Sequence, residues 1–491
     1  MGQAKVDVLI PLILYFLFVY FLGFYSLKFV SRARQTKGKN FLVEYLIGGR
    51  SLGGFVLAMT LVATYLSAGS FIGGPGAAYT YGLAWVYLAM TQMPTGYFTL
   101  AVLGKKFAII ARKINAVTMT DFLKERYENK LVIILCSLSI VFFFTASMAA
   151  QWIGAARLLE GSVGLSYTTA LTFFGVTVLV YTTIGGYRAV ALTDTLQGVV
   201  MTVGTAAVII AAIIVGGGVS NLVNGLYAIH PGLISPYGVD PQFTSAAWVT
   251  SYWILVGFAI VGLPQVAVRA MSYRDSKSLK EAIIYGTIVS MVLLLGMHLL
   301  GAFGRVLIPG IEAGDLVVPT IITSLFPNWA AGIILAGPLA AVMSTVDSQL
   351  LLAVGAIVND IYVNLINPRI KKTASLAFAA SVFLGIIIFI VAYNPPPLMV
   401  WLNLYAHGGT IATFLWPIIL GLYWKKANAQ GALASIITGI GSYMLFHNFW
   451  PRPLGMHTIV LPLIISLATF VIVSLFTPGP SKKIIERFWG P

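Results

Sequence analysis

The sequence predicts an all-α integral membrane protein, and three observations support this prediction. The chain of 491 residues is 58% hydrophobic and 9% charged, with a mean hydropathy of +0.91, whereas soluble domains carry about 25% charged residues. Apolar segments of about 20 residues, the length that crosses a bilayer as a helix, recur along the chain. Lys and Arg gather in short loops between these segments, as they do on the cytoplasmic side of membrane proteins.

Thirteen apolar segments have the length expected of membrane-spanning helices. They lie at 7–29, 52–79, 83–103, 131–158, 167–185, 190–215, 247–270, 283–305, 330–363, 374–393, 396–423, 430–450 and 457–477. The loops between them are too short for an independent core, so we expect residues 1–491 to form a single integral membrane domain.

The basic loops all fall on one side of this thirteen-span arrangement. Arg188, Arg274 and Lys425 mark three of them, while the loops at 216–246 and 306–329 contain almost no Lys or Arg. The asymmetry predicts a multi-pass protein of the cell's inner (plasma) membrane, with its N-terminus outside and its C-terminus in the cytoplasm. It also explains the net charge of +15 without a nucleic-acid partner, and no obligate protein partner is indicated.

Two spans are interrupted by Gly and Pro. The second contains SAGSFIGGPGAAY at 67–79, and the seventh contains Gly257, Gly262 and Pro264. Such residues open the backbone hydrogen-bond ladder, which a bilayer tolerates only where the freed groups line a cavity or pack against protein. We therefore expect an unwound segment near Ser67–Gly76, although ordinary Gly and Pro content of membrane helices is an alternative explanation.

The interrupted spans occupy matching positions in two halves of five spans each. The halves cover 52–215 and 247–423, with one extra helix before them at 7–29 and two after them at 430–477. Because each half has an odd number of spans, the second must be inverted relative to the first. Matched interruptions in inverted repeats are typical of a transporter's binding site.

A polar stripe lies inside the ninth span, where residues 341–348 read AVMSTVDS. Ala341, Ser344, Thr345 and Ser348 share one helical face. Hydroxyl and backbone carbonyl oxygens suit a small hard cation such as Na⁺. A single hydroxyl in a membrane helix usually bonds the carbonyl four residues earlier, but four small or hydroxylated residues on one stripe favour an ion site.

Two carboxylates, Asp194 and Asp347, lie near or within apolar spans, where an ionisable group is a functional candidate. Asp194 has an alternative role as an interfacial cap at a helix N-terminus. Asp347 has an alternative role as the partner of a buried hydroxyl or amide.

Enzymatic functions find no support in the sequence. The five histidines are scattered, with no pair spaced for haem or zinc, and no phosphate-binding GxxxxGK[ST] loop is present. We therefore expect a transporter that is not an enzyme and is driven by an ion gradient. A passive channel remains an alternative, but it would be expected to show a charged ring or a carbonyl filter.

Six stretches of the chain resemble the sodium/solute symporter family. They are EYLIGGRSLGG (44–54), SAGSFIGGPGAAYTYGLAWV (67–86), QWIGAARLLE (151–160), IGGYRAVALTDTLQG (184–198), AAVMSTVDSQLL (340–351) and LGLYWKKANAQGA (420–432). The resemblance runs from about residue 42 to about residue 480. It implies a LeuT-like core of two inverted five-helix repeats, with one helix before it and two after. It also implies Na⁺-coupled uptake of a small solute, with the anion pantothenate the best match and proline, a sugar or a monocarboxylate as alternatives.

The resemblance also implies a central Na⁺ site. Carried over by position, its ligands are the carbonyls of Ala63, Leu66 and Ala341 and the hydroxyls of Ser344 and Thr345.

Some members of the family have a second Na⁺ site, which in this chain would use Asp194, Asp347 and Ser348. Asp347 stands where those members carry a hydroxyl, so the number of coupled ions stays open.

Substrate ligands in the family come from the helix breaks and from two further core helices. The resemblance places them here at Ser67, Gly69, Ser70, Gln151 and Asn403. Arg157 and Arg269 are cationic alternatives for an anionic substrate, although both are more typical of interfacial anchors.

Overall fold

The computed structural model describes residues 5–35, 50–240, 245–367 and 373–490, and within these ranges the protein is built of helices without a strand. The basic loops at 36–49 and 368–372 lie outside the described residues. The helices are α1 (Val6–Gln35), α3 (Gly54–Tyr65), α4 (Gly74–Tyr81), α5 (Leu83–Ala89), α6 (Thr95–Val102), α7 (Gly104–Lys113), α8 (Met119–Tyr127), α9 (Lys130–Val163), α10 (Tyr167–Val215), α11 (Val219–Ile229), α12 (Ala246–Tyr252), α13 (Pro264–Ala267), α14 (Ser276–Leu307), α15 (Val317–Leu325), α16 (Asn328–Gly355), α17 (Thr373–Ala392), α18 (Met399–Tyr423), α19 (Ala429–Phe449), α20 (Val460–Phe476) and α21 (Lys482–Trp489).

Each predicted span corresponds to helix in the described residues, apart from the two breaks, short turns and a few residues at span ends. Among the described residues, seven helices are long and apolar enough to cross a membrane, and two bent helix pairs raise that number to nine. The other four predicted spans are shorter or divided, and they correspond to Val6–Leu22 in α1, the α5–α6 pair, Tyr167–Val180 in α10, and α20.

Helix α10 covers two of the predicted spans and folds back on itself. Gln197 donates to the Tyr15 hydroxyl at 3.1 Å, and the Tyr20 hydroxyl donates to the Thr177 carbonyl at 3.0 Å. The two tyrosines are separated by only about 7.5 Å of helical rise, whereas residues 177 and 197 would be about 30 Å apart in a straight helix. These contacts favour a reversal of the chain between Thr177 and Gln197, and Tyr167–Val180 and Thr193–Val215 are separate apolar segments, which agrees with two spans rather than one.

The two predicted interruptions are confirmed, with a correction to the first. The axes of α3 and Gly69–Tyr81 differ by 70°, and those of Ala246–Gly262 and Pro264–Met271 differ by 57°. The breaks fall at Leu66 (φ −78°, ψ 116°) and Leu263 (φ −86°, ψ 114°), which share nearly the same extended backbone.

The unwound segment is shorter than the sequence suggested, because residues 69–81 are helical apart from their opening turn. Pro75 lies in the first turn of α4, where its missing N–H costs nothing. The glycines instead allow close packing. A Cβ at Gly69 would lie 2.7 Å from Asn403 Nδ2, and one at Gly74 would lie 2.4 Å from His298 Nε2.

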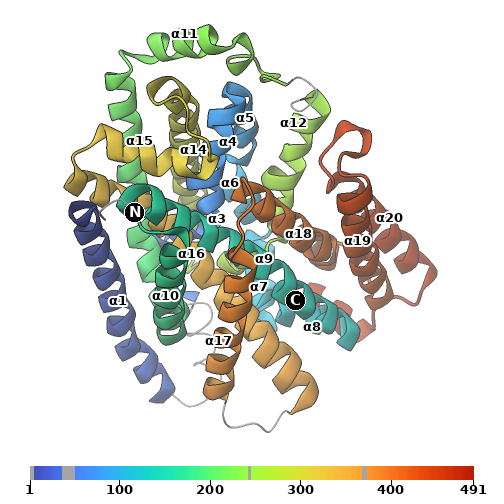
Figure 1. The fold of residues 1–491 in the computed structure, drawn as a ribbon. Coiled ribbons are helices and arrows are strands. Elements are labelled where there is room, and N and C mark those ends of the chain that lie inside the picture. Colours follow the sequence, from blue (N-terminus) through green and yellow to red (C-terminus); the bar gives the residue numbers. More distant parts are fainter. Residues whose placement is uncertain (1–4, 36–49, 241–244, 368–372, 491) are drawn as a thin grey trace.

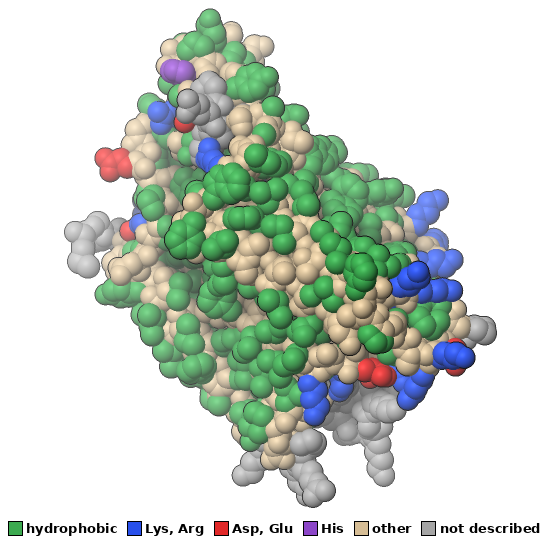
Figure 2. Space-filling view, turned by 90° about the vertical axis from the view of Figure 1, so that its right-hand side faces the viewer, with side chains coloured by type: hydrophobic (Ala, Val, Ile, Leu, Met, Phe, Trp, Pro, Cys, Tyr) green, Lys and Arg blue, Asp and Glu red, His purple; other side chains and the backbone are tan. Residues whose placement is uncertain are grey.

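The extra helices flank the core on opposite sides (Figure 1). Helix α1 packs against α10 and α16, and α19 packs against α18 and α20. Hydrophobic side chains cover the middle of the face in Figure 2, while most Lys and Arg lie along its right and lower-right edge and a few at its upper left. This distribution is that of a membrane protein with one basic surface.

A buried arginine fixes the end of α18, one of the helices that carries predicted site residues. Arg126 in α8 is fully buried and donates to the carbonyls of Gly421 (2.9 Å), Ala427 (2.8 Å) and Trp424 (3.3 Å). It thereby satisfies carbonyls at a helix C-terminus, where a cation also complements the helix dipole.

Replacing Arg126 with Met should destabilise the protein, because buried carbonyls would lose their donors at a cost of roughly 1–3 kcal/mol each. We expect the melting temperature of the purified protein to fall by several degrees. Arg274→Met is the matched control, since that side chain is 64% exposed and its loss should change the melting temperature little. Equal melting temperatures for the two variants would contradict the capping role.

Candidate functional site

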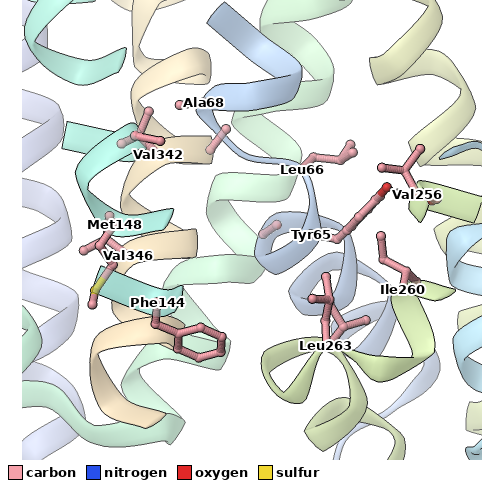
Figure 3. Packing of buried hydrophobic residues seen from close by; sticks show 14 of the residues in the cluster. Tyr65, Leu66, Ala68, Phe144, Met148, Val256, Ile260, Leu263, Val342 and Val346 are labelled. Carbon is pink, nitrogen blue, oxygen red and sulfur yellow. Dashed lines mark hydrogen bonds between the residues drawn. The ribbon is translucent and has the colours of Figure 1, made fainter. Parts of the chain in front are cut away.

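The site is built around the break after α3. Leu66 leaves the helix in an extended conformation, and Ser67 starts the next helical segment. The Ser67 hydroxyl accepts from the Gly69 amide at 3.1 Å, and its carbonyl accepts from the Ser70 amide at 2.9 Å. Figure 3 shows Tyr65 and Leu66 on one side of the break and Ala68 on the other.

The hydroxyl stripe of α16 faces the carbonyls that end α3. Ser344 Oγ donates to the Ala63 carbonyl at 2.7 Å, and Thr345 Oγ1 lies 3.4 Å from the Thr64 carbonyl. Both hydroxyls also contact carbonyls of their own helix, including that of Ala341 at 3.2 Å and 3.0 Å. Ser344 and Thr345 are almost completely buried.

Four of the five predicted central ligands therefore meet at one place: Ala63, Ala341, Ser344 and Thr345. The fifth, Leu66, is the extended residue of the adjacent break.

This arrangement suits a hard monovalent cation. Neutral hydroxyl and carbonyl oxygens converge, and the described residues contain no cluster of three His, Cys, Asp or Glu side chains that would hold a transition metal. Each hydroxyl hydrogen now points at a carbonyl. A cation entering between the two helices would take over these carbonyl oxygens, and the hydroxyls could rotate to present their own lone pairs.

A small cavity lies beside the break. Ser67, Gly69, Ser70 and Asn403 line it, so four of the five predicted substrate residues share this space. Its volume is about 30 Å³, room for a water molecule or two and too little for an organic solute. The cavity must therefore expand before an organic solute can bind in it.

Gln151, the remaining predicted substrate residue, stands behind the cavity and braces the break. Its Oε1 accepts from the Ala68 amide at 2.8 Å, and its Nε2 donates to Asn403 Oδ1 at 3.1 Å. Ser147 also contacts Asn403 Oδ1, at 3.3 Å, and accepts from Gln349 at 2.9 Å. A hydrogen-bonded chain thus runs from α16 through α9 and α18 to the break.

The residues of the predicted second ion site are separated. Asp194 Oδ2 lies 3.3 Å from Arg269 Nη2, which also donates to Ser348 Oγ at 2.8 Å. Asp347 turns elsewhere and accepts from the Thr182 hydroxyl at 2.6 Å.

Two expectations from the sequence are wrong. Asp194 is fully buried within α10 and does not cap a helix at the interface. Arg269 is 2% exposed and paired with Asp194, so it is neither an interfacial anchor nor a residue of the cavity lining. Arg157 instead pairs with Glu160 at 2.7 Å in a partly exposed position.

Several lining residues escaped the sequence analysis, chiefly His298, Gln92, Trp85 and Tyr252. His298 was detectable, because a lone ionisable side chain in the apolar run of α14 is itself a signal. Its Nδ1 lies 2.7 Å from the Leu294 carbonyl, which assigns the proton to Nδ1 and leaves Nε2 as an acceptor. The two aromatic rings carried no such signal.

Comparisons with known proteins agree with this architecture. A family model described as the sodium:solute symporter family matches residues 45–439. A sodium/pantothenate symporter of Escherichia coli (strain K12) is 46% identical over 485 residues, which cover 98% of this chain and 99% of that protein. A protein of the same name from Haemophilus influenzae is 46% identical over 95% of this chain and 96% of its own length.

A solved structure of a Na⁺-coupled sialic acid symporter in a substrate-bound, outward-open state shares the fold. Its TM-score is 0.77 at 19% identity, with 97% of this chain and 99% of that chain covered. The predicted LeuT-like fold class, five plus five helices with additional flanking helices, is thereby confirmed. The chain belongs to the sodium:solute symporter family.

Proposed function

We propose that this protein moves pantothenate into the cytoplasm together with Na⁺ by alternating access. The observation that carries the proposal is the convergence of the Ser344 and Thr345 hydroxyls on the carbonyls at the end of α3. The substrate is suggested by the 46% identity, over nearly the whole chain, to two relatives that bear pantothenate in their names.

The cavity suits a hydroxylated amide carboxylate such as pantothenate. Ser67, Ser70, Asn403 and His298 offer hydroxyl, amide and imidazole groups, and none of the described lining residues is Lys or Arg. The negative charge of the substrate therefore needs another partner. A Na⁺ ion at Ala63 would lie four residues along the same broken helix, where it would attract a carboxylate strongly in a medium of low dielectric constant.

The closeness of the proposed Na⁺ position to the cavity would couple the binding of Na⁺ to the binding of the substrate. The amides of Ala68 and Gly69 are already bonded to Gln151 and Ser67, so the start of the second half-helix is held in place without a ligand. Na⁺ would fix the other side of the break, and the substrate would then bind a more ordered site. By linkage, the substrate raises the affinity for Na⁺ by the same factor.

We further propose the orientation and the repeat boundaries that the sequence indicates. Basic loops on one surface favour a cytoplasmic C-terminus and an external N-terminus. The nearly identical extended conformations of Leu66 and Leu263 favour a first repeat at 52–215 and a second at 247–423. With one Na⁺ and one monoanion the cycle moves no net charge, whereas each extra Na⁺ would add about 2.3 kcal/mol per 100 mV.

The purified protein in liposomes should accumulate labelled pantothenate when an inward Na⁺ gradient is imposed. Replacing Na⁺ with K⁺ should abolish accumulation, because the proposed coupling is to Na⁺ and no Na⁺ gradient would then drive uptake. Excess unlabelled pantothenate should compete with the label, while proline should not. Accumulation without a Na⁺ gradient would contradict coupling, and competition by proline alone would contradict the substrate.

The double variant Ser344→Ala and Thr345→Ala should raise the Na⁺ concentration for half-maximal uptake about tenfold or more, equivalent to about 1.4 kcal/mol or more. The matched control is Thr438→Ala in α19, whose hydroxyl likewise bonds the carbonyl four residues earlier but lies away from the break. An unchanged Na⁺ dependence in the double variant would refute these ligands.

Gln151→Leu should raise the KM for the substrate about tenfold, because the Ala68 amide and Asn403 lose a shared partner. The control is Ser139→Ala, which removes a hydrogen bond between the same two helices at Thr413 and should leave the KM within about twofold. If both variants shift the KM equally, the KM depends on the packing of α9 against α18, and a specific role for the Gln151 hydrogen bonds is refuted.

A further inference from the structure

We propose that the Arg269 guanidinium is a fixed cation standing where a second Na⁺ would bind, so that the protein holds one Na⁺ per chain. This inference rests on the proposed sodium coupling and settles its stoichiometry. It starts from the three residues predicted for a second ion, Asp194, Asp347 and Ser348, of which only two face one another in the structure.

The guanidinium occupies the space between those two residues. Arg269 Nη2 is 3.3 Å from Asp194 Oδ2 and 2.8 Å from Ser348 Oγ. All three side chains are at most 3% exposed. A cation coordinated by Asp194 and Ser348 would have to lie where this nitrogen is.

The hydrogen-bond directions also disfavour an added ion. Ser348 Oγ accepts an N–H from Arg269 and lies 3.4 Å from Thr64 Oγ1. Asp194 Oδ2 accepts from both Thr60 (2.6 Å) and Arg269 (3.3 Å), so the lone pairs of these two oxygens are largely in use. Asp194 Oδ1 has no hydrogen-bond partner among the described residues. Of the Asp194 and Ser348 oxygens, Oδ1 alone is without a hydrogen bond, whereas a hard cation requires several oxygen ligands.

Charge balance points the same way. Asp194 and Arg269 neutralise each other, so a Na⁺ placed beside them would leave an uncompensated positive charge in a buried site, which is costly. The Asp347 carboxylate, for its part, accepts the hydroxyl proton of Thr182 on α10 through its Oδ1.

The second helix break places the arginine. Leu263 is extended and Pro264 starts a new half-helix, bent by 57° from the segment before it. Arg269 lies in the last turn of that half-helix, and its Nη1 donates to the Gln265 carbonyl at 2.7 Å, which orients the guanidinium. The half-helix after the break at Leu263 thus places the Arg269 guanidinium between α10 and α16. The break at Leu66, in the other half of the chain, lies at the proposed central site.

Equilibrium binding of radioactive Na⁺ to the detergent-purified full chain, without substrate, tests this inference. We expect saturation at one ion per chain. The double variant Asp194→Asn and Arg269→Gln removes both charges together, and its Na⁺ affinity should stay within about threefold of wild type. The variant Ser344→Ala and Thr345→Ala should lose most of the binding.

Two ions per wild-type chain would overturn the inference, and so would a tenfold or greater loss of affinity in the double variant, which would make Asp194 an ion ligand. The wild-type count decides the matter even if that variant does not fold. Wild-type protein that binds no Na⁺ would instead refute the sodium coupling, a failure distinct from a count of two. Because no substrate is present, an error in the substrate assignment would not affect the result.

Discussion

The structure depends on how a broken helix is held inside a membrane. Where α3 ends, its last carbonyls have no amide partners in their own helix, and a bilayer offers no water to replace them. Ser344 supplies a hydroxyl to Ala63, and Thr345 approaches Thr64. The same oxygens that must be satisfied for the fold to persist are those that a small cation can use. In the proposed function, fold stability and ion binding would compete for this one set of atoms.

Polar braces between helices recur throughout the core. Gln151 and Asn403 hold the start of the half-helix after the first break, and Arg269 ties the half-helix after the second break to Asp194 and Ser348. Both half-helices are thus fixed to neighbours from other parts of the chain. Leu66 and Leu263 join these half-helices to the preceding segments in an extended conformation. This is the arrangement expected of hinges between rigid bodies.

The sequence predicted most of the architecture because membrane helices leave local signals. Periodicity and composition predicted the span lengths, the basic loops, the two interruptions and the hydroxyl face of residues 341–348. The sequence could not predict the partner of Asp194, because Arg269 lies 75 residues away and reaches it only through the second bend. It also misplaced the first break among the glycines, since Gly69 and Gly74 serve close packing while Leu66 takes the extended conformation. The resemblance to the family supplied the predicted central ligand set. The helical spacing of residues 341–348 alone indicated only the ligands that lie on α16.

The most direct test of the central ion site is a crystal structure with Tl⁺, a monovalent cation whose anomalous scattering identifies its position. The account predicts an anomalous peak bounded by the Ala63 carbonyl and the Ser344 and Thr345 hydroxyls, with α3 and α16 still in contact. No peak at that position, or a peak between Asp194 and Ser348 instead, would contradict it.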